Sequence, residues 1–254
     1  MMAVGHNGYI TTPGEASFQA EFTGVIDDAV RQLKATLGDV LHSIYVYGSV
    51  ARGKATVGRS DLDLCIIFYR PLQLVQESAL ASLRSELEAA HPMVSKIDFD
   101  CGILPEVMAA ENLHSWGYWL KHHCRCVHGV DLAGRFRRFK PSRAIVVALN
   151  GDYLSVLHDY IERIRQVDDV NQRRRLQQSA AKKLIRATSL WRGEQDRDWP
   201  ETLEEHAIKF IHRYPQLTDE INYFLAQGQQ ADARHREFIV RLQALMACLQ
   251  QLVR

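Results

Sequence analysis

Hydrophobic positions recur along this chain with two different spacings, and the balance between them changes near residue 105. Before that point, stretches with helical spacing alternate with short runs of β-branched and aromatic residues, which favour strands. The predicted helices cover residues 18–37 and 74–90, and the predicted strands cover residues 43–47, 62–69 and 94–104. This order of elements predicts a mixed sheet with flanking helices.

Beyond residue 105 the spacing of apolar residues is almost entirely helical. One short β-branched run, at residues 145–147, is the exception. Helices are predicted over residues 153–165, 172–191, 202–212 and 233–253. We therefore predict an α/β domain at residues 1–130, a connector at 131–141 and an all-α domain at 142–254.

Composition narrows the class of protein. The chain is 46% hydrophobic and 24% charged with a formal net charge of +1, so no overall field marks it as a nucleic-acid or membrane binder. Its apolar stretches are much shorter than the roughly 20 residues that cross a bilayer, and no secretory leader is visible at its amino terminus. Five scattered cysteines argue against a disulfide framework, so we expect a cytoplasmic protein.

The first candidate for chemistry is a glycine turn. Gly48 and Ser49 directly follow a predicted strand, where exposed backbone amides can approach a phosphate. Ser49 adds a hydroxyl donor, and Arg52 and Lys54 can neutralise a triphosphate. The run from Gly48 to Lys54 also fits most of a P-loop, but Ala55 stands where that motif needs a hydroxyl, so we reject the P-loop interpretation.

Two aspartates follow at the start of the next predicted strand. Asp61 and Asp63 are separated by one residue, so both carboxylates project to one face while Leu62 and Leu64 point into the core. Two carboxylates this close repel each other unless a cation lies between them. Magnesium prefers such hard oxygen ligands and shares them with substrate phosphates. The alternative, a plain turn followed by two exposed acids, explains neither the Gly-Ser pair nor the flanking leucines.

These residues resemble the signature of the DNA polymerase beta-like nucleotidyltransferase superfamily. Tyr47-Gly48-Ser49 and Asp61-Leu62-Asp63-Leu64 match its two parts. The resemblance implies two Mg²⁺ ions at Asp61, Asp63 and a third carboxylate, with ATP or another nucleoside triphosphate as co-substrate. It further implies in-line attack by an acceptor oxygen on the α-phosphate, with pyrophosphate leaving. The nucleotide-binding residues are then expected to be Gly48, Ser49, Arg52, Ser60 and Lys183.

The third carboxylate of that superfamily lies on a later strand. Asp98 is the natural match in this chain, as a metal ligand or as the base that accepts the proton of the acceptor hydroxyl. Asp100 lies on the same strand face and is the alternative. A solvated position on an edge strand would explain Asp98 without any catalytic role.

The helical half of the chain gives the evidence on the chemical nature of the acceptor. Residues 181–193 resemble the carboxy-terminal domain of bacterial aminoglycoside adenylyltransferases of the streptomycin-spectinomycin type, which implies AMP transfer to a small molecule. An acidic cleft would suit a polycationic acceptor, and a plain exposed turn is the competing interpretation of the candidate acids Glu194, Asp196 and Asp198. The basic residues 173–175, Lys182, Lys183 and Arg186 instead fit a triphosphate or a polynucleotide.

Two further clusters have structural explanations that we prefer. Residues 122–128 contain zinc-type ligands but lack a second Cys/His pair at a recognised spacing, so we expect a helix end there. Residues 135–140 interleave aromatics with cations, as single-strand binders do, and also fit a basic connector with two buried phenylalanines.

The leading hypothesis is therefore a magnesium-dependent enzyme that nucleotidylates a small molecule. Transfer to a protein hydroxyl or an RNA end is the alternative among enzymes, and nucleic acid is the less favoured partner. A nucleotide-binding relative without turnover is the non-enzyme alternative, although the intact acids argue against it. Base preference, acceptor identity and oligomeric state stay open at this stage.

Overall fold

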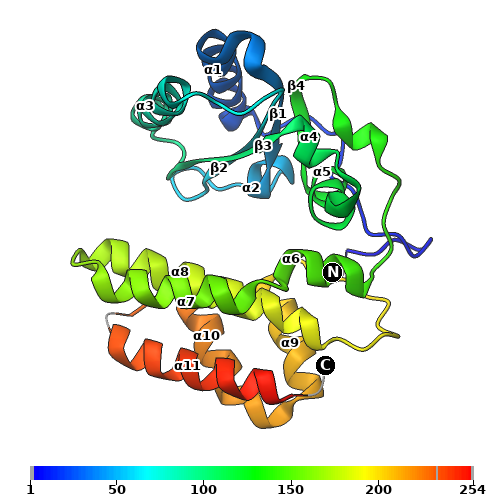
Figure 1. Cartoon of the computed structure of the whole chain (residues 1–254), viewed down its shortest axis with the longest axis vertical. Helices are drawn as coiled ribbons and strands as arrows, with labels where there is room; N and C mark the ends of the chain where they lie inside the picture. Colours follow the sequence, from blue (N-terminus) through cyan, green and yellow to red (C-terminus); the bar gives the residue numbers. More distant parts are fainter. Residues whose placement is uncertain (1–2, 233, 253–254) are drawn as a thin grey trace. The chain divides into compact units, whose positions relative to one another are not determined.

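The computed structural model of the protein describes residues 3–232 and 234–252 (Figure 1). The chain divides into two compact units. The amino-terminal unit is Ile10–Phe139, and the helical unit contains the chain from Lys140 onward together with the residues before Ile10. The predicted fold class, a mixed sheet with flanking helices followed by a helical part, is confirmed.

A four-stranded sheet of order β3-β2-β1-β4 is the framework of the amino-terminal unit. β1 pairs antiparallel with both β2 and β4, whereas β2 and β3 run parallel. The strands are β1 (Leu41–Tyr47), β2 (Leu62–Phe68), β3 (Ile97–Ile103) and β4 (Arg125–Gly129).

Two long helices, α1 (Ala20–Leu37) and α3 (Leu74–Ala90), cover one face of this sheet (Figure 1). Their apolar stripes pack on alternate residues of β2, and the shared core includes Phe22, Leu64 and Leu87, all fully buried. α1 ends at Gly38, and α3 begins with a capping box at Gln73, so both helices stop and start where the sequence supplies cap residues.

The other face of the sheet is covered by shorter elements. A second apolar cluster there includes Tyr45, Cys65 and Leu120. The elements around it are α2 (Gly48–Ala51), α4 (Leu104–Val107), the turns η2 (Ala110–Asn112), η3 (Leu113–Gly117) and η4 (Leu132–Arg135), and α5 (Tyr118–His123). This face is the one on which Asp63, Asp98 and Asp100 lie.

One local prediction was incomplete, and one strand signal was wrong. Residues 122–126 were expected at a helix end; α5 does end at His123, but the chain then enters β4, which pairs with β1. β4 lies at the edge of the sheet with its residues half-buried, so it lacks the apolar alternation that marks a strand. The β-branched run at residues 145–147 lies in a helix, which Ser142 caps by accepting a hydrogen bond from the backbone N–H of Ile145 at 3.4 Å.

In the helical unit, α8 packs against α7 and α10, with Leu157, Leu184 and Phe224 fully buried (Figure 1). Residue 233 of the predicted last helix lies outside the described residues, as does 253. No helix in the described part of the chain is long and apolar enough to cross a membrane. The elements are α6 (Arg143–Asn150), α7 (Tyr153–Gln166), α8 (Val170–Ala187), η5 (Thr188–Trp191), α9 (Leu203–Arg213), η6 (Pro215–Leu217), α10 (Thr218–Gln229) and α11 (His235–Gln251).

Candidate functional site

The glycine turn begins where β1 ends. Gly48 has φ +72°, in the left-handed region that favours glycine. A Cβ atom at this position would lie 2.0 Å from Oδ2 of Asp63, because Tyr47 pairs in register with Asp63 on the neighbouring strand. Gly48 therefore permits both the turn and the close approach of a carboxylate to its backbone.

The carboxylates gather at one end of β2 and β3. Asp63 stands opposite Asp98 in the parallel register, and Asp61 directly precedes β2. Oδ1 of Asp61 accepts a hydrogen bond from the Ser95 hydroxyl at 2.5 Å. Oδ2 of Asp98 lies 2.6 Å from Nζ of Lys96. The predicted acids thus lie on neighbouring segments, although each of the outer two already has a local partner.

Asp63 is the electrostatically perturbed member of the set. Burial, followed by the negative charges of Asp61 and Asp98, raises the pKa of Asp63 to about 6, while Lys96 opposes the shift. A carboxyl that holds its proton until near-neutral pH gains from a cation placed beside it. This perturbation supports a functional role for Asp63.

Asp100 makes a different contact on the same face. Its Oδ2 accepts a hydrogen bond from the Tyr47 hydroxyl. Burial and this neighbouring carboxylate raise the pKa of Tyr47 well above its usual range. Asp98 is the one opposite Asp63, and Asp100 lies one step further along β3, opposite Cys65. The choice of Asp98 over Asp100 stays a prediction.

The donor set suits a divalent cation in its chemistry. Asp61, Asp63 and Asp98 offer hard carboxylate oxygens, and their mutual repulsion is what such an ion relieves. Among the described residues, however, no three Asp, Glu, His or Cys side chains already surround one point as ligands do. Ser95 contacts only Oδ1 of Asp61 and Lys96 only Oδ2 of Asp98, so each outer carboxylate keeps a second oxygen that could bind an ion.

The expected phosphate-binding residues flank the turn. Arg52 is exposed and makes no ion pair with any described residue, so its charge is available. The Ser60 hydroxyl oxygen accepts a hydrogen bond from the Thr56 N–H at 2.8 Å, which orders the loop before Asp61 and leaves the hydroxyl proton free to be donated. Ser49 lies in the first turn of α2, half-buried beside Gly48.

Comparison with known protein families shows which kind of domain carries a glycine turn and aspartates in this arrangement. Residues 26–107, which run from α1 to the end of α4, match the family model described as a nucleotidyltransferase domain. The matched part of the amino-terminal unit is similar to a nucleotidyltransferase domain. This match contains Gly48, Asp61, Asp63 and Asp98, and it confirms the predicted enzyme class.

The fold of the chain has a known relative as well. Spectinomycin adenyltransferase AAD(9) from Enterococcus faecialis, solved with ATP and spectinomycin, superposes with a TM-score of 0.61 over 90% of this chain and 99% of that chain. Sequence identity is 14%, so the likeness shows the fold alone. No curated protein matches the chain in sequence. The predicted resemblance to the polymerase beta-like superfamily and to this type of adenylyltransferase is confirmed as a domain family and a fold.

Sequence reasoning missed the polar partners of the nucleotidyltransferase acids. Ser95 and Lys96 hold Asp61 and Asp98, and Tyr47 holds Asp100. A signal existed for Lys96, because it stands two residues before Asp98 and so shares its strand face. The contact between Ser95 and Asp61 depends on the parallel pairing of β2 with β3, which no local pattern predicts.

Lys183, expected at the nucleotide, belongs to the helical unit. Its Nζ lies 2.7 Å from Oδ1 of Asp152 and donates to the carbonyl of Leu149 at 3.2 Å. Its charge is therefore compensated within α8 and the α6–α7 turn.

The candidate acids of the helical unit are partly engaged too. Asp196 accepts a hydrogen bond from the Gly193 N–H at 2.8 Å, and Asp198 forms ion pairs with Arg192 and Lys209. Burial alone would raise the pKa of Asp198, but these two cations lower it below its ordinary value. Glu194 is exposed.

The two remaining clusters hold the amino-terminal unit together. Nε2 of His122 accepts the Phe139 N–H at 3.0 Å, so Nδ1 carries the proton and donates to the Thr11 carbonyl at 2.9 Å. Burial lowers the pKa of His122 and keeps it neutral. In the basic run at residues 135–140, Phe136 packs so closely on Gly117 that a Cβ there would lie 2.9 Å from the ring.

Proposed function

We propose that this chain is a magnesium-dependent nucleotidyltransferase that transfers a nucleoside monophosphate, AMP in the first instance, to a hydroxyl of a small molecule. The observation that carries the proposal is the convergence of the Gly48 turn with Asp61, Asp63 and Asp98 within a nucleotidyltransferase domain. The geometry supplies close carboxylates beside a backbone turn without side-chain obstruction, which is what transfer from a nucleoside triphosphate requires.

Asp61, Asp63 and Asp98 would hold the magnesium, as two ions. Bound magnesium neutralises charge on the triphosphate and on the attacking and leaving oxygens. The chain's own contribution is positional. The raised pKa of Asp63 supports its place at the centre of the set, because a cation there relieves the repulsion from its two neighbours.

The triphosphate would lie along the turn. The Gly48 backbone and the Ser49 and Ser60 hydroxyls donate hydrogen bonds, and Arg52 supplies positive charge. The acceptor oxygen then forms a bond to the α-phosphorus while the bond to pyrophosphate breaks. The hydroxyl proton goes to Asp98 if that residue acts as base instead of completing the ligand set. The role of Lys183 at the nucleotide stays a prediction; its Nζ lies beside Asp152 and the Leu149 carbonyl.

An aminoglycoside-like acceptor is supported by the fold relative, which was solved with ATP and spectinomycin. The engagement of Asp198 with Arg192 and Lys209 leaves Asp196 and Glu194 as the acids that remain for a cationic acceptor.

The direct test measures which molecule receives the labelled α-phosphate of ATP. Protein is incubated with ATP labelled at the α-phosphate, magnesium and a panel of aminoglycosides, and both labelled product and pyrophosphate are measured. We expect acceptor-dependent release of pyrophosphate that stops with a chelator. Parallel reactions with the other nucleoside triphosphates give the base preference. Label that appears on the protein or on added RNA would overturn the small-molecule acceptor, and tight ATP binding without transfer to any acceptor would overturn turnover itself.

A further inference from the structure

β3 presents an open strand edge. It is the terminal strand of the sheet, and the carbonyl of Lys96, the residue just before it, accepts the Leu62 N–H at 2.9 Å. In a parallel ladder alternate residues bond the same neighbour, so Ile97, Phe99 and Cys101 direct their N–H and C=O groups outward. The Ile97 N–H donates a hydrogen bond to Oε1 of Glu88 on α3 at 2.9 Å. No described residue bonds the N–H of Phe99 or Cys101, so an unpaired edge begins there.

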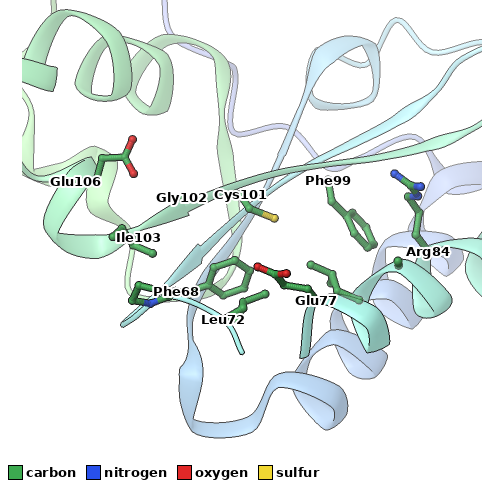
Figure 2. Close-up of a pocket in the computed structure, with 12 residues that line it drawn as sticks. Phe68, Leu72, Glu77, Arg84, Phe99, Cys101, Gly102, Ile103 and Glu106 are labelled. Atoms are coloured by element: carbon green, nitrogen blue, oxygen red, sulfur yellow. The ribbon is translucent and has the colours of Figure 1, made fainter. Parts of the chain in front are cut away.

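An apolar groove lies directly beside this edge. It has a volume of about 500 Å³ and lies between β3, the end of β2 and α3, on the sheet face opposite the acids. Figure 2 shows Phe99 of β3 with Leu72 and Glu77 around this space. The larger apolar side chains that line it are Phe68, Pro71, Leu72, Leu80, Phe99 and Ile103.

The apolar surface continues past the groove. Leu74 and Val75, at the start of α3, are 84% and 69% exposed and follow the groove residue Leu72 in sequence. Large apolar side chains exposed together mark a surface that another molecule covers. An unpaired strand edge next to such a surface is a template for strand addition.

The charges beside the edge are mainly negative. Glu77 and Glu106 line the groove together with the cation Arg84. On the other face of the same strand lie Asp98 and Asp100, with the cation Lys96 ion-paired to Asp98 at 2.6 Å. A strand added to β3 would therefore meet carboxylates on both of its faces, and basic side chains complement them.

We propose that the β3 edge and its groove bind an extended segment of a partner protein in which apolar residues alternate with Lys or Arg. The segment pairs with the backbone of Phe99 and Cys101, its apolar side chains enter the groove, and its basic side chains lie on the face of Asp98 and Asp100. A second copy of β3 fits poorly, because antiparallel pairing of the two strands would bring like carboxylates together. Strand addition at this edge does not require the proposed transfer reaction, although the bound segment would lie beside Asp98, which also belongs to the proposed magnesium site.

The probe is a fluorescent, end-capped peptide of alternating Val and Lys, about eight residues long to match a typical strand. Its control has the same composition arranged in Val-Val-Lys-Lys blocks, so that no face is uniformly apolar. Anisotropy titrations without nucleotide should show the alternating peptide binding about tenfold tighter or more. Replacing Lys by Glu in the alternating peptide should abolish this preference. Equal binding of the alternating and block peptides would overturn the proposal.

A matched pair of variants tests the edge itself. Cys101→Pro removes an outward N–H without touching the pairing to β2, and Cys101→Val keeps it. The first should lose the preference for the alternating peptide and the second should retain it, with folding checked by circular dichroism. Unchanged binding in Cys101→Pro would overturn the proposal.

Hydrogen exchange on the unmodified protein gives a readout that does not depend on the variant folding. The peptide should slow exchange of the Phe99 and Cys101 amides, and absence of that protection contradicts strand addition. Sedimentation completes the test. A dimer that Cys101→Pro dissociates and that the peptide leaves intact would show a second copy on the edge, and the partner segment would have to be abandoned.

Discussion

The two faces of β2 differ in their contribution to stability: one stabilises the fold and the other carries a half-buried carboxylate that costs stability. Leu62, Leu64 and Ile66 point to the face that α1 and α3 cover, and all are fully buried. Between them, Asp63 points to the other face, where it meets Asp98. Each buried leucine or isoleucine stabilises the fold by about 1.5–3 kcal/mol. Ionised Asp63 costs on the order of 1–3 kcal/mol in return, since its pKa is raised to about 6. Alternation along one strand thus combines a stabilising apolar surface with Asp63, a carboxylate whose ionised form is destabilised.

The sharpest test of this contrast is Asp63→Asn. The change keeps size and removes charge, so we expect transfer to fall by about 10³-fold or more, as when a group that stabilises developing charge is lost. The unfolding free energy of the metal-free protein should rise, because the repulsion disappears. Both are measured on one sample, by pyrophosphate release and by urea unfolding.

Asp39→Asn is the matched control, because that carboxylate is 87% exposed and distant in sequence from the acids. It should leave transfer and stability near those of the parent protein. Near-normal turnover of Asp63→Asn at saturating magnesium would remove Asp63 from the site.

Leu64→Ala, one residue away, should have the opposite profile. Leu64 is fully buried, and truncating such a leucine lowers the unfolding free energy by about 3 kcal/mol. The folded fraction should keep its kcat and KM, because the side chain faces α1 and α3. Denaturant unfolding and steady-state kinetics at low temperature check this, with the exposed Leu74→Ala as control. A large loss of kcat in folded Leu64→Ala would mean that the two faces are not separable.

The features that the sequence alone predicts also differ between the two faces of the sheet. The apolar face was predictable because β-branched and aromatic runs mark β1 and β2, and alternation marks β3. The pair Asp61 and Asp63 was also visible, since a spacing of two puts side chains on one strand face. β4 was missed because an edge strand with half-buried residues carries little pattern. The partners Ser95 and Lys96 depend on strand pairing across the sheet, which local spacing does not encode.

The energetic cost of ionised Asp63 should appear as a dependence of the unfolding free energy on pH. The folded-state pKa of Asp63 is raised to about 6 from 3.8, so the folded protein holds this proton more tightly than the unfolded chain does. Its contribution to stability is full below about pH 4, declines as pH rises through the window to about 6, and is constant above.

Measuring urea unfolding of the parent and of Asp63→Asn from pH 4 to 7.5, with a chelator present, isolates that contribution. The advantage of Asn should grow by on the order of 1–3 kcal/mol across the window, because other titrating groups cancel in the difference. Added magnesium should reduce it if Asp63 binds the ion. A difference that stays flat with pH would show that Asp63 is not perturbed.

The smallest effect is expected at Ser49, which lies on the carboxylate side but outside the acids. Ser49→Ala removes one hydroxyl donor and leaves the Gly48 turn intact, so ATP affinity should fall by about 1 kcal/mol, roughly fivefold. The unfolding free energy should stay within about 0.5 kcal/mol of the parent, because Ser49 is half-buried and its loss opens no cavity in the α1–α3 core. Calorimetric titration with a non-hydrolysable ATP analogue measures the first quantity and urea unfolding the second. Arg52→Gln is the companion variant, and it should weaken binding more steeply at low salt because its effect is electrostatic. If Ser49→Ala and Arg52→Gln both bind the analogue as the parent does, the triphosphate does not lie along this turn, and the carboxylate face would need a different substrate.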